Sequence, residues 1–189
     1  MRVLILGPQG SGKGTQAKRI ADAHGVPHVS TGDILRAAVA DETELGLRVK
    51  PILERGDLVP DELMVDLIRE RLAGEDGFVL DGFPRTLAQA EALDAMLAEI
   101  GKPLDTVLLL EVSDEASSRR MHGRAAEEGR SDDTPEVIAN RLRLYHELTR
   151  PVVERYRAAG ELAVVDGEQT MDEVFAAIES ALAGSGATS

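Results

Sequence analysis

A glycine-rich segment near the start of the chain has the residue types and spacing of a phosphate-binding loop. It reads Gly7-Pro8-Gln9-Gly10-Ser11-Gly12-Lys13-Gly14-Thr15 and directly follows the apolar run 3–6. Glycines permit positive φ and remove side chains, so successive backbone N–H groups can turn toward one anion at the start of a helix. Lys13 adds a full positive charge. The segment predicts a nucleoside triphosphate site, and a glycine turn without a ligand is the alternative.

The loop departs at one position from the general pattern, in which Ser or Thr directly follows the lysine. Gly14 stands after Lys13, and the hydroxyl comes one residue later, at Thr15. The apolar run before the loop predicts a strand, and the residues 16–23 after the loop predict a helix. The order strand, loop, helix is the setting that a phosphate-cradling loop requires.

Asp81 and Arg85 form a second group of residues that could do chemistry. Asp81 follows Val79 and Leu80 at the end of an expected strand, and Arg85 comes four residues later. A carboxylate at this position can face the triphosphate loop and hold Mg²⁺, usually through water, while Arg85 can bind a phosphate. A turn or helix-capping aspartate and an ordinary surface arginine are the alternatives.

Further arginines follow along the chain. Phosphoryl transfer is catalysed mostly by positioning and by neutralising charge on the transferring oxygens, which requires several convergent arginines with Mg²⁺. Arg120 and Arg124 are one helical turn apart on the same face of an expected helix. Each arginine taken alone could equally be a solvated surface charge. The candidates are Arg36, Arg120, Arg124, Arg130 and Arg141.

Composition narrows the classes of function. The net charge of −13 argues against general binding to nucleic acid or to an anionic membrane, where affinity comes from a basic surface. The chain has no cysteine, so a disulfide, a thiol nucleophile and a cysteine zinc cluster are excluded. No apolar run has transmembrane length, and we expect a cytoplasmic protein. The four histidines lack metal-ligand spacing and are interpreted as surface or packing residues: His24, His28, His122 and His146.

The hydrophobic pattern predicts an α/β fold with a parallel sheet covered by helices on both faces. Short apolar runs bounded by turn residues predict strands at 3–6, 28–30, 78–80, 106–112 and 162–165. Helices are expected between them, including one from 114 to about 122 and a long one after 134 that Pro151 kinks or restarts. A helical insertion is expected at 30–59, with Pro51 kinking or restarting its second helix. Ligands then lie at the carboxyl ends of the strands.

Taken together, these motifs resemble the adenylate kinases over nearly the whole chain. The resemblance lies in four segments that have that family's order and spacing, although Gln9 stands where its members commonly have proline. They are Gly12-Lys13-Gly14-Thr15-Gln16-Ala17, Ser30-Thr31-Gly32-Asp33-Ile34-Leu35-Arg36, Asp81-Gly82-Phe83-Pro84-Arg85 and Arg130-Ser131-Asp132-Asp133. The resemblance implies a P-loop NTPase-type sheet of five parallel strands.

The resemblance also implies roles for individual residues. ATP would bind through Gly10, Ser11, Gly12, Lys13, Gly14, Thr15 and Arg124, with its adenine near the backbone of Gln169. AMP would bind at Thr31, Arg36, Asp57, Leu58, Val59, Gly82, Phe83, Pro84, Arg85 and Gln89. Arg120, Arg130 and Arg141 would converge on the phosphates between the nucleotides, and Asp81 would hold Mg²⁺.

The implied organisation is a core of 1–29, 60–122 and 134–189, an AMP-binding insertion at 30–59 and a short lid at 123–133. Such a lid is too short for the zinc site of longer relatives, so no structural zinc is expected. The implied reaction is reversible transfer of the γ-phosphoryl group of Mg·ATP to AMP, in a monomer. A UMP or CMP kinase of the same fold is the nearest alternative, although Thr31 and Gln89 favour adenine. A nucleotide-binding module without kinase activity is the second alternative.

Overall fold

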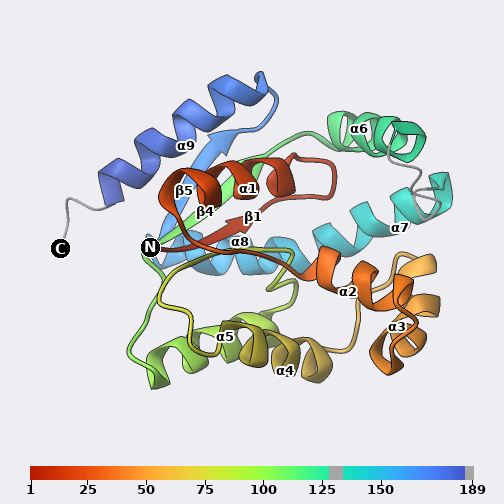
Figure 1. The fold of residues 1–189 in the computed structure, drawn as a ribbon. Helices are drawn as coiled ribbons and strands as arrows, with labels where there is room; N and C mark the ends of the chain where they lie inside the picture. The colour runs from red at the N-terminus through yellow and green to blue at the C-terminus, as the bar shows by residue number, and fades with distance from the viewer. Residues whose placement is uncertain (128–133, 186–189) are drawn as a thin grey trace.

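Within residues 1–127 and 134–185, which this computed structural model describes, five strands form one parallel sheet in the order β2-β3-β1-β4-β5 (Figure 1). The strands are β1 (Arg2–Leu6), β2 (His28–Ser30), β3 (Phe78–Asp81), β4 (Thr106–Glu111) and β5 (Leu162–Asp166). In this register Ile5 lies opposite both Asp81 and Leu108. The expected fold class is confirmed, and the carboxyl ends of the strands share one edge of the sheet.

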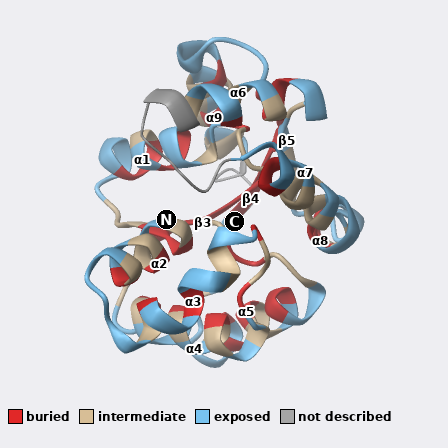
Figure 2. Ribbon diagram, turned by 90° about the vertical axis from the view of Figure 1, so that its right-hand side faces the viewer, coloured by how far each residue is buried: buried red, intermediate tan, exposed pale blue. Residues whose placement is uncertain are grey.

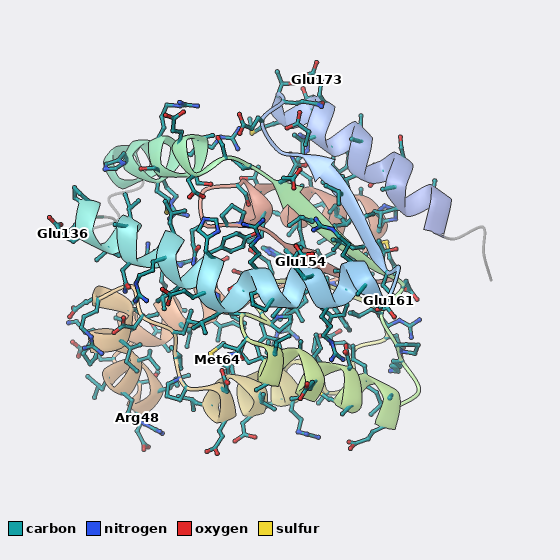
Figure 3. All side chains as sticks on the ribbon, turned by 180° about the vertical axis from the view of Figure 1, so that it is seen from behind. Arg48, Met64, Glu136, Glu154, Glu161 and Glu173 are labelled. Atoms are coloured by element: carbon teal, nitrogen blue, oxygen red, sulfur yellow. The ribbon has the colours of Figure 1, made fainter. Side chains whose placement is uncertain are left out.

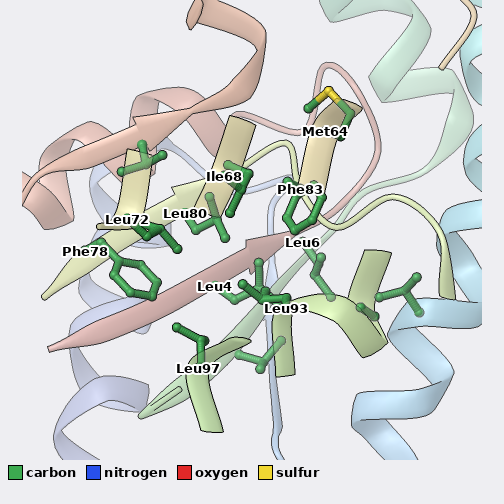
Figure 4. Close-up of a cluster of buried hydrophobic side chains, with 14 of the residues drawn as sticks. Leu4, Leu6, Met64, Ile68, Leu72, Phe78, Leu80, Phe83, Leu93 and Leu97 are labelled. Carbon is green, nitrogen blue, oxygen red and sulfur yellow. The ribbon is translucent and has the colours of Figure 1, made fainter. Parts of the chain in front are cut away.

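Helices cover both faces of this sheet, as expected from its apolar strands. Their bounds are α1 (Lys13–His24), α4 (Asp61–Leu72), α5 (Leu87–Glu99), α8 (Arg150–Ala158) and α9 (Met171–Ser185). The side chains of β1 alternate between two cores. Val3 and Ile5 pack with α1 and α9, whereas Leu4 and Leu6 pack with α4, α5 and α8. Figure 4 shows the second core, where Leu4 and Leu6 lie beside Leu93.

Burial follows these two cores closely (Figure 2). The central strands β1, β3 and β4 and the inward faces of the helices are buried, whereas the edge strand β5 and the outward faces of the helices are largely exposed or half-buried. Fully burying a side chain such as Leu4 or Leu93 contributes about 1.5–3 kcal/mol relative to leaving it in water. This apolar burial holds the carboxyl edge of the sheet, and the loops that leave it, in one arrangement.

The insertion between β2 and β3 contains two helices, α2 (Thr31–Ala40) and α3 (Glu44–Glu54). Ser30 caps α2, because its Oγ accepts a hydrogen bond from the Asp33 N–H at 3.3 Å. The helices cross in close contact at Gly46, where an added Cβ would lie 1.9 Å from the Ala38 carbonyl oxygen. The expected restart at Pro51 is wrong: α3 continues through it as one helix, with Pro51 exposed, and the expected kink stays a prediction.

Two helices flank the residues 128–133, which lie outside the described part of the chain. They are α6 (Asp114–Glu127) and α7 (Pro135–Leu144). The helix expected to end near 122 continues five residues further, because Ala125 and Ala126 are strong helix formers that outweigh Gly123. The segment 123–133, which the resemblance implies to be a lid, is therefore helical over 123–127 and outside the described residues over 128–133.

The helical run after Thr134 changes from α-helix to a π-helical turn in its middle and then returns to α-helix. Thr134 caps α7, and a π-helical turn, η1 (Tyr145–Thr149), separates it from α8. Pro151 cannot donate to the carbonyl four residues earlier, and a wider turn before it avoids the clash of its ring with the helix. The predicted restart at Pro151 is confirmed. Figure 3 shows this run from behind, from Glu136 at one end to beyond Glu154. No helix in the described ranges is long and apolar enough to cross a membrane.

Candidate active site

The glycine-rich loop connects the end of β1 to the start of α1, at the carboxyl edge of the sheet. Gly10 has φ +80°, and an added Cβ would lie 2.5 Å from the Ser117 carbonyl oxygen. Gly12 has φ +92° and precedes the first residue of α1, Lys13. A side chain at Gly10 would therefore be strained and would clash with backbone. The loop leaves the N–H groups at the start of α1 free to bind an anion.

Lys13 is held inside this loop. Its Nζ donates to the Pro8 carbonyl oxygen at 2.7 Å and lies 3.5 Å from Ser11 Oγ. Burial lowers the pKa of the ammonium group to about 8. Asp81 acts in the opposite direction, while the positive charges of Arg85 and Arg124 lower the pKa further. The site thus concentrates positive charge, which a bound polyphosphate would relieve.

Asp81 ends β3 and is buried against the loop, with an exposed fraction of 8%. Its Oδ2 lies 3.5 Å from the position that a Cβ on Gly14 would take and 3.9 Å from His28 Nε2. The described residues contain no group of three or more His, Asp or Glu side chains that could hold a metal ion. A cation here would need oxygen ligands from a nucleotide or from water in addition to Asp81.

Arg85 lies next to Asp81, in the turn between β3 and α5. Its Nε donates to the Gly82 carbonyl oxygen at 2.8 Å, and Thr149 Oγ1 donates to its carbonyl oxygen at 2.9 Å. Burial lowers the pKa of Arg85, and the charges of Arg141 and Arg36 act in the same direction, while Asp81 opposes them. The structure therefore brings three of the predicted arginines into one electrostatic cluster.

Arg120 reaches the cleft from α6, on the other side of the loop. Its Nη1 donates to the Gly167 carbonyl oxygen at 2.9 Å and to the Ser11 carbonyl oxygen at 3.4 Å. Gly167 follows the end of β5 and packs closely against Val112 and the Glu111 carbonyl oxygen, while an added Cβ would lie 3.5 Å from the Ser11 carbonyl oxygen of the loop, an ordinary contact. The structure thus places Arg120 against the backbone between the loop and Gly167. Its expected role on the phosphates stays a prediction.

One cleft of about 740 Å³ runs from the loop to the helical insertion. Next to the insertion, Gly82 has φ +83° and lies close to Thr31. An added Cβ on Gly82 would lie 2.5 Å from Thr31 Oγ1. Arg36 pairs with Asp33, and Gln89 is buried with an exposed fraction of 2%. The predicted residues that line this cleft are Gly10, Ser11, Gly12, Lys13, Gly14, Thr15, Thr31, Arg36, Asp57, Leu58, Val59, Asp81, Gly82, Arg85, Gln89, Arg120, Arg124, Arg141 and Gln169.

Comparison with known proteins agrees with this geometry. The family model described as "Adenylate kinase" matches residues 5–161. The chain belongs to the adenylate kinase family. A protein named "Adenylate kinase" from Xanthomonas campestris pv. campestris (strain 8004) is 50% identical over 185 residues, which cover 96% of this chain and 99% of the relative. Another of that name, from Stenotrophomonas maltophilia (strain R551-3), is 48% identical over 97% of this chain and 100% of the relative.

Two predicted site residues in the described part of this chain, Phe83 and Pro84, do not line the cleft. Phe83 and Pro84 border a separate small cavity of about 30 Å³ behind the loop, together with Gln9. Phe83 is 1% exposed and belongs to the apolar core, so its side chain is a packing residue. Arg130 lies outside the described residues. The expected roles of Phe83, Pro84 and Arg130 in binding AMP stay predictions.

The structure also adds residues for which the sequence predicted no role in the site, among them His28, expected to be a surface or packing residue. His28 lines the cleft, and its Nε2 is buried, has no hydrogen-bond partner in the described residues and lies 3.9 Å from Asp81. Met64 lines the insertion end, and Met171 and Val174 line the end near Gln169. Because an apolar residue at helical spacing looks the same in a core and in a pocket, only the three-dimensional arrangement identifies these positions.

Proposed function

We propose that the chain catalyses the reversible transfer of the γ-phosphoryl group of Mg·ATP to AMP, giving two molecules of ADP. One observation carries this proposal: a single cleft is lined at one end by the phosphate-binding loop and at the other by Thr31, Arg36 and Gln89. Two nucleotides bound in one cleft meet through their phosphates. A hydrolase or a switch protein needs only the first of these two sites.

At the donor end, the loop residues 10–15 bind the phosphates of ATP through backbone N–H groups and the Lys13 ammonium group. Gln169 flanks the nucleoside, and Arg120, which donates to the Gly167 carbonyl oxygen nearby, contributes charge toward the phosphates of ATP. Met171 and Val174 line this part of the cleft and offer apolar contact to the base. Arg124 contributes charge from the same face of α6 as Arg120.

At the acceptor end, AMP is bound by residues of the insertion and of the turn after β3. Gln89 reads the base, since its amide offers both a donor and an acceptor. Arg36 and Arg85 bind the phosphate of AMP. Thr31, Gly82 and the backbone at 57–59 surround the nucleoside. Arg130 and Arg141 are proposed to join the arginines between the two phosphates.

Asp81 fits a role in holding Mg²⁺ on the nucleotide. Its carboxylate is an oxygen donor, is buried beside Lys13 and faces Gly14 at the start of α1. Asp81, with the Thr15 hydroxyl, water and the nucleotide itself, would hold the ion, which would supply positive charge to neutralise the phosphate oxygens. No protein cluster in the described residues would bind the ion without nucleotide.

The reaction needs no covalent enzyme intermediate. An oxygen of the AMP phosphate attacks the γ-phosphorus, and the bond from that phosphorus to the oxygen bridging the β-phosphate breaks. The arginines neutralise charge on the oxygens during the transfer, and Lys13 stabilises the phosphates of the donor. Closing the insertion 30–59 and the lid 123–133 over the core would exclude water, which competes with AMP as acceptor.

A UMP or CMP kinase of the same fold and a nucleotide-binding module without activity are not favoured. The test is a panel of AMP, CMP, UMP and GMP with Mg·ATP, in an assay that measures nucleoside diphosphate formed. AMP should have the highest kcat/KM. Preference for a pyrimidine would overturn the acceptor assignment, and absence of transfer to every acceptor would overturn the reaction. A cytoplasmic monomer that binds neither nucleic acid nor membrane stays a prediction.

A further inference from the structure

The side-chain amide of Gln89 is bound by the protein at both ends. Its Nε2 donates to Asp61 Oδ1 at 2.8 Å, and its Oε1 accepts from the Arg85 N–H at 2.7 Å. The residue lies in the first turn of α5, where its own N–H donates to Thr86 Oγ1 at 3.2 Å. Backbone and side chain of Gln89 are thus both held at the acceptor end of the cleft.

These two partners determine which end of the amide is nitrogen. A carboxylate only accepts hydrogen bonds and a backbone N–H only donates them. A flipped amide would turn its oxygen toward Asp61 and its NH₂ group toward the Arg85 N–H. Both contacts would then be repulsive, and two buried groups would lose their partners, which is costly at a position as buried as Gln89.

The remaining hydrogen-bonding capacity of this amide has a defined polarity. One N–H and one oxygen lone pair are left after the two protein contacts. Adenine presents an acceptor at N1 beside a donor at the 6-amino group, and an amide can bind such a pair in bidentate fashion. Guanine and hypoxanthine present the inverse, a donor at N1 beside an acceptor at O6. An amide that is free to flip could bind either arrangement.

We propose that Asp61 is a specificity-determining residue that prevents the Gln89 amide from flipping and so selects 6-amino over 6-oxo purine monophosphates. This inference rests on the proposed function and deepens it. Asp61 is the first residue of α4, directly after the insertion, and does not line the cleft. It is therefore a positioning residue, which acts on the acceptor through Gln89 without touching it.

The test compares AMP with inosine 5′-monophosphate as acceptors, because their bases differ only at positions 1 and 6. We measure kcat/KM for both with Mg·ATP, at a temperature below the lowest Tm of the variants. Asp61→Asn keeps the size of the side chain but can present either a donor or an acceptor to Gln89. Asp61→Ala removes the partner altogether and serves as the second variant. Glu62→Gln is the matched control, since it removes a charge from the same turn of α4 at an exposed position.

The AMP-to-IMP ratio of kcat/KM should fall by about 10- to 100-fold in Asp61→Asn and Asp61→Ala, the effect of losing a hydrogen bond to a charged group. The change should appear mainly in the KM of the acceptor, with the KM of ATP unchanged. Glu62→Gln should keep the wild-type ratio. An unchanged ratio in folded Asp61 variants would overturn the inference while the proposed function stands. A wild-type protein that does not phosphorylate AMP, or that prefers IMP, would instead overturn the proposed function.

Discussion

The Lys13 ammonium group donates to the Pro8 carbonyl oxygen across 2.7 Å, so the charge is held inside the same loop that carries it. This contact spans five residues and orients the side chain toward the turn of the loop, beside Ser11. The carbonyl oxygen compensates part of the cost of burying the ammonium group. Lys13 is therefore positioned before a nucleotide arrives, and its charge depends on pH near neutrality.

Replacing Lys13 should remove most of the activity. Lys13→Met is expected to lower kcat/KM by about 10²–10³-fold or more, because a positioned charge that stabilises transferring phosphate oxygens is lost. A coupled assay for ADP measures this. Lys50→Met provides the control, since Lys50 is exposed on α3 and does not line the cleft. Near-normal rates for Lys13→Met would contradict the assignment of the loop.

The pKa of Lys13 predicts a pH dependence of ATP binding. Burial lowers this pKa to about 8, so the ligand-free side chain is charged below that pH and loses its proton as the pH rises through it. A polyphosphate binds the charged form better, and the Kd for ATP should therefore be constant below pH 8 and rise above it. The limit is about tenfold per pH unit for one coupled proton. Calorimetry between pH 7 and 9.5 measures this, and Lys13→Met should lose the pH dependence.

The lowered pKa of Lys13 also makes the free energy of unfolding depend on pH. Between the folded pKa of about 8 and the unfolded value near 10.5, the unfolded chain binds more protons at Lys13 than the folded protein does. The contribution of this residue to the free energy of unfolding therefore rises with pH across that window. Comparing wild type with Lys13→Met by chemical denaturation at pH 7 and pH 10 isolates it. An equal pH dependence in both proteins would show that Lys13 does not titrate in this range.

Arg85 and Arg120 should differ in their kinetic effects because their contacts differ. Arg85 lies beside Asp81 within the arginine cluster, so Arg85→Ala is expected to lower kcat by about 10³–10⁵-fold. Arg120 donates to backbone at Gly167, and Arg120→Ala should mainly raise the KM for ATP. Steady-state kinetics with each substrate varied separates the two. A change of less than tenfold in kcat for Arg85→Ala would refute its assignment.

Two glycines in helices should respond oppositely to the same substitution. An added Cβ at Gly46 would lie 1.9 Å from the Ala38 carbonyl oxygen, whereas at Gly123 nothing lies within 4 Å. Gly46→Ala should destabilise the protein by about 1–3 kcal/mol or more through overpacking. Gly123→Ala should stabilise it by about 0.5–1 kcal/mol, because alanine is the better helix former. Thermal unfolding measures both, and shifts in the same direction would contradict this account of the α2–α3 contact.

Much of the fold could be predicted because its signals are local. The apolar run 3–6 and the glycines that follow it specify a strand, a loop and a helix start within a dozen residues. The caps at Thr86 and Thr134 likewise depend on an N–H three residues away. α6 extends past its expected end near 122, because one glycine weighs less than the two alanines after it. The expected restart at Pro51 does not occur, because a helix can continue past a proline on its exposed side.

The sequence by itself determined that a phosphate-binding loop follows a buried strand and that several arginines accompany it. These features can be predicted because hydrophobic periodicity, glycine spacing and charge type are properties of residues close together in the sequence and do not depend on how the chain packs. Only the tertiary structure decided that His28 lies beside Asp81, that Arg120 contacts Gly167 and that Gln89 is held between Asp61 and Arg85. These contacts join segments 28 to 53 residues apart in three of the four cases, counted from the residue numbers. Their geometry depends on how helices pack on the sheet, which no local pattern encodes.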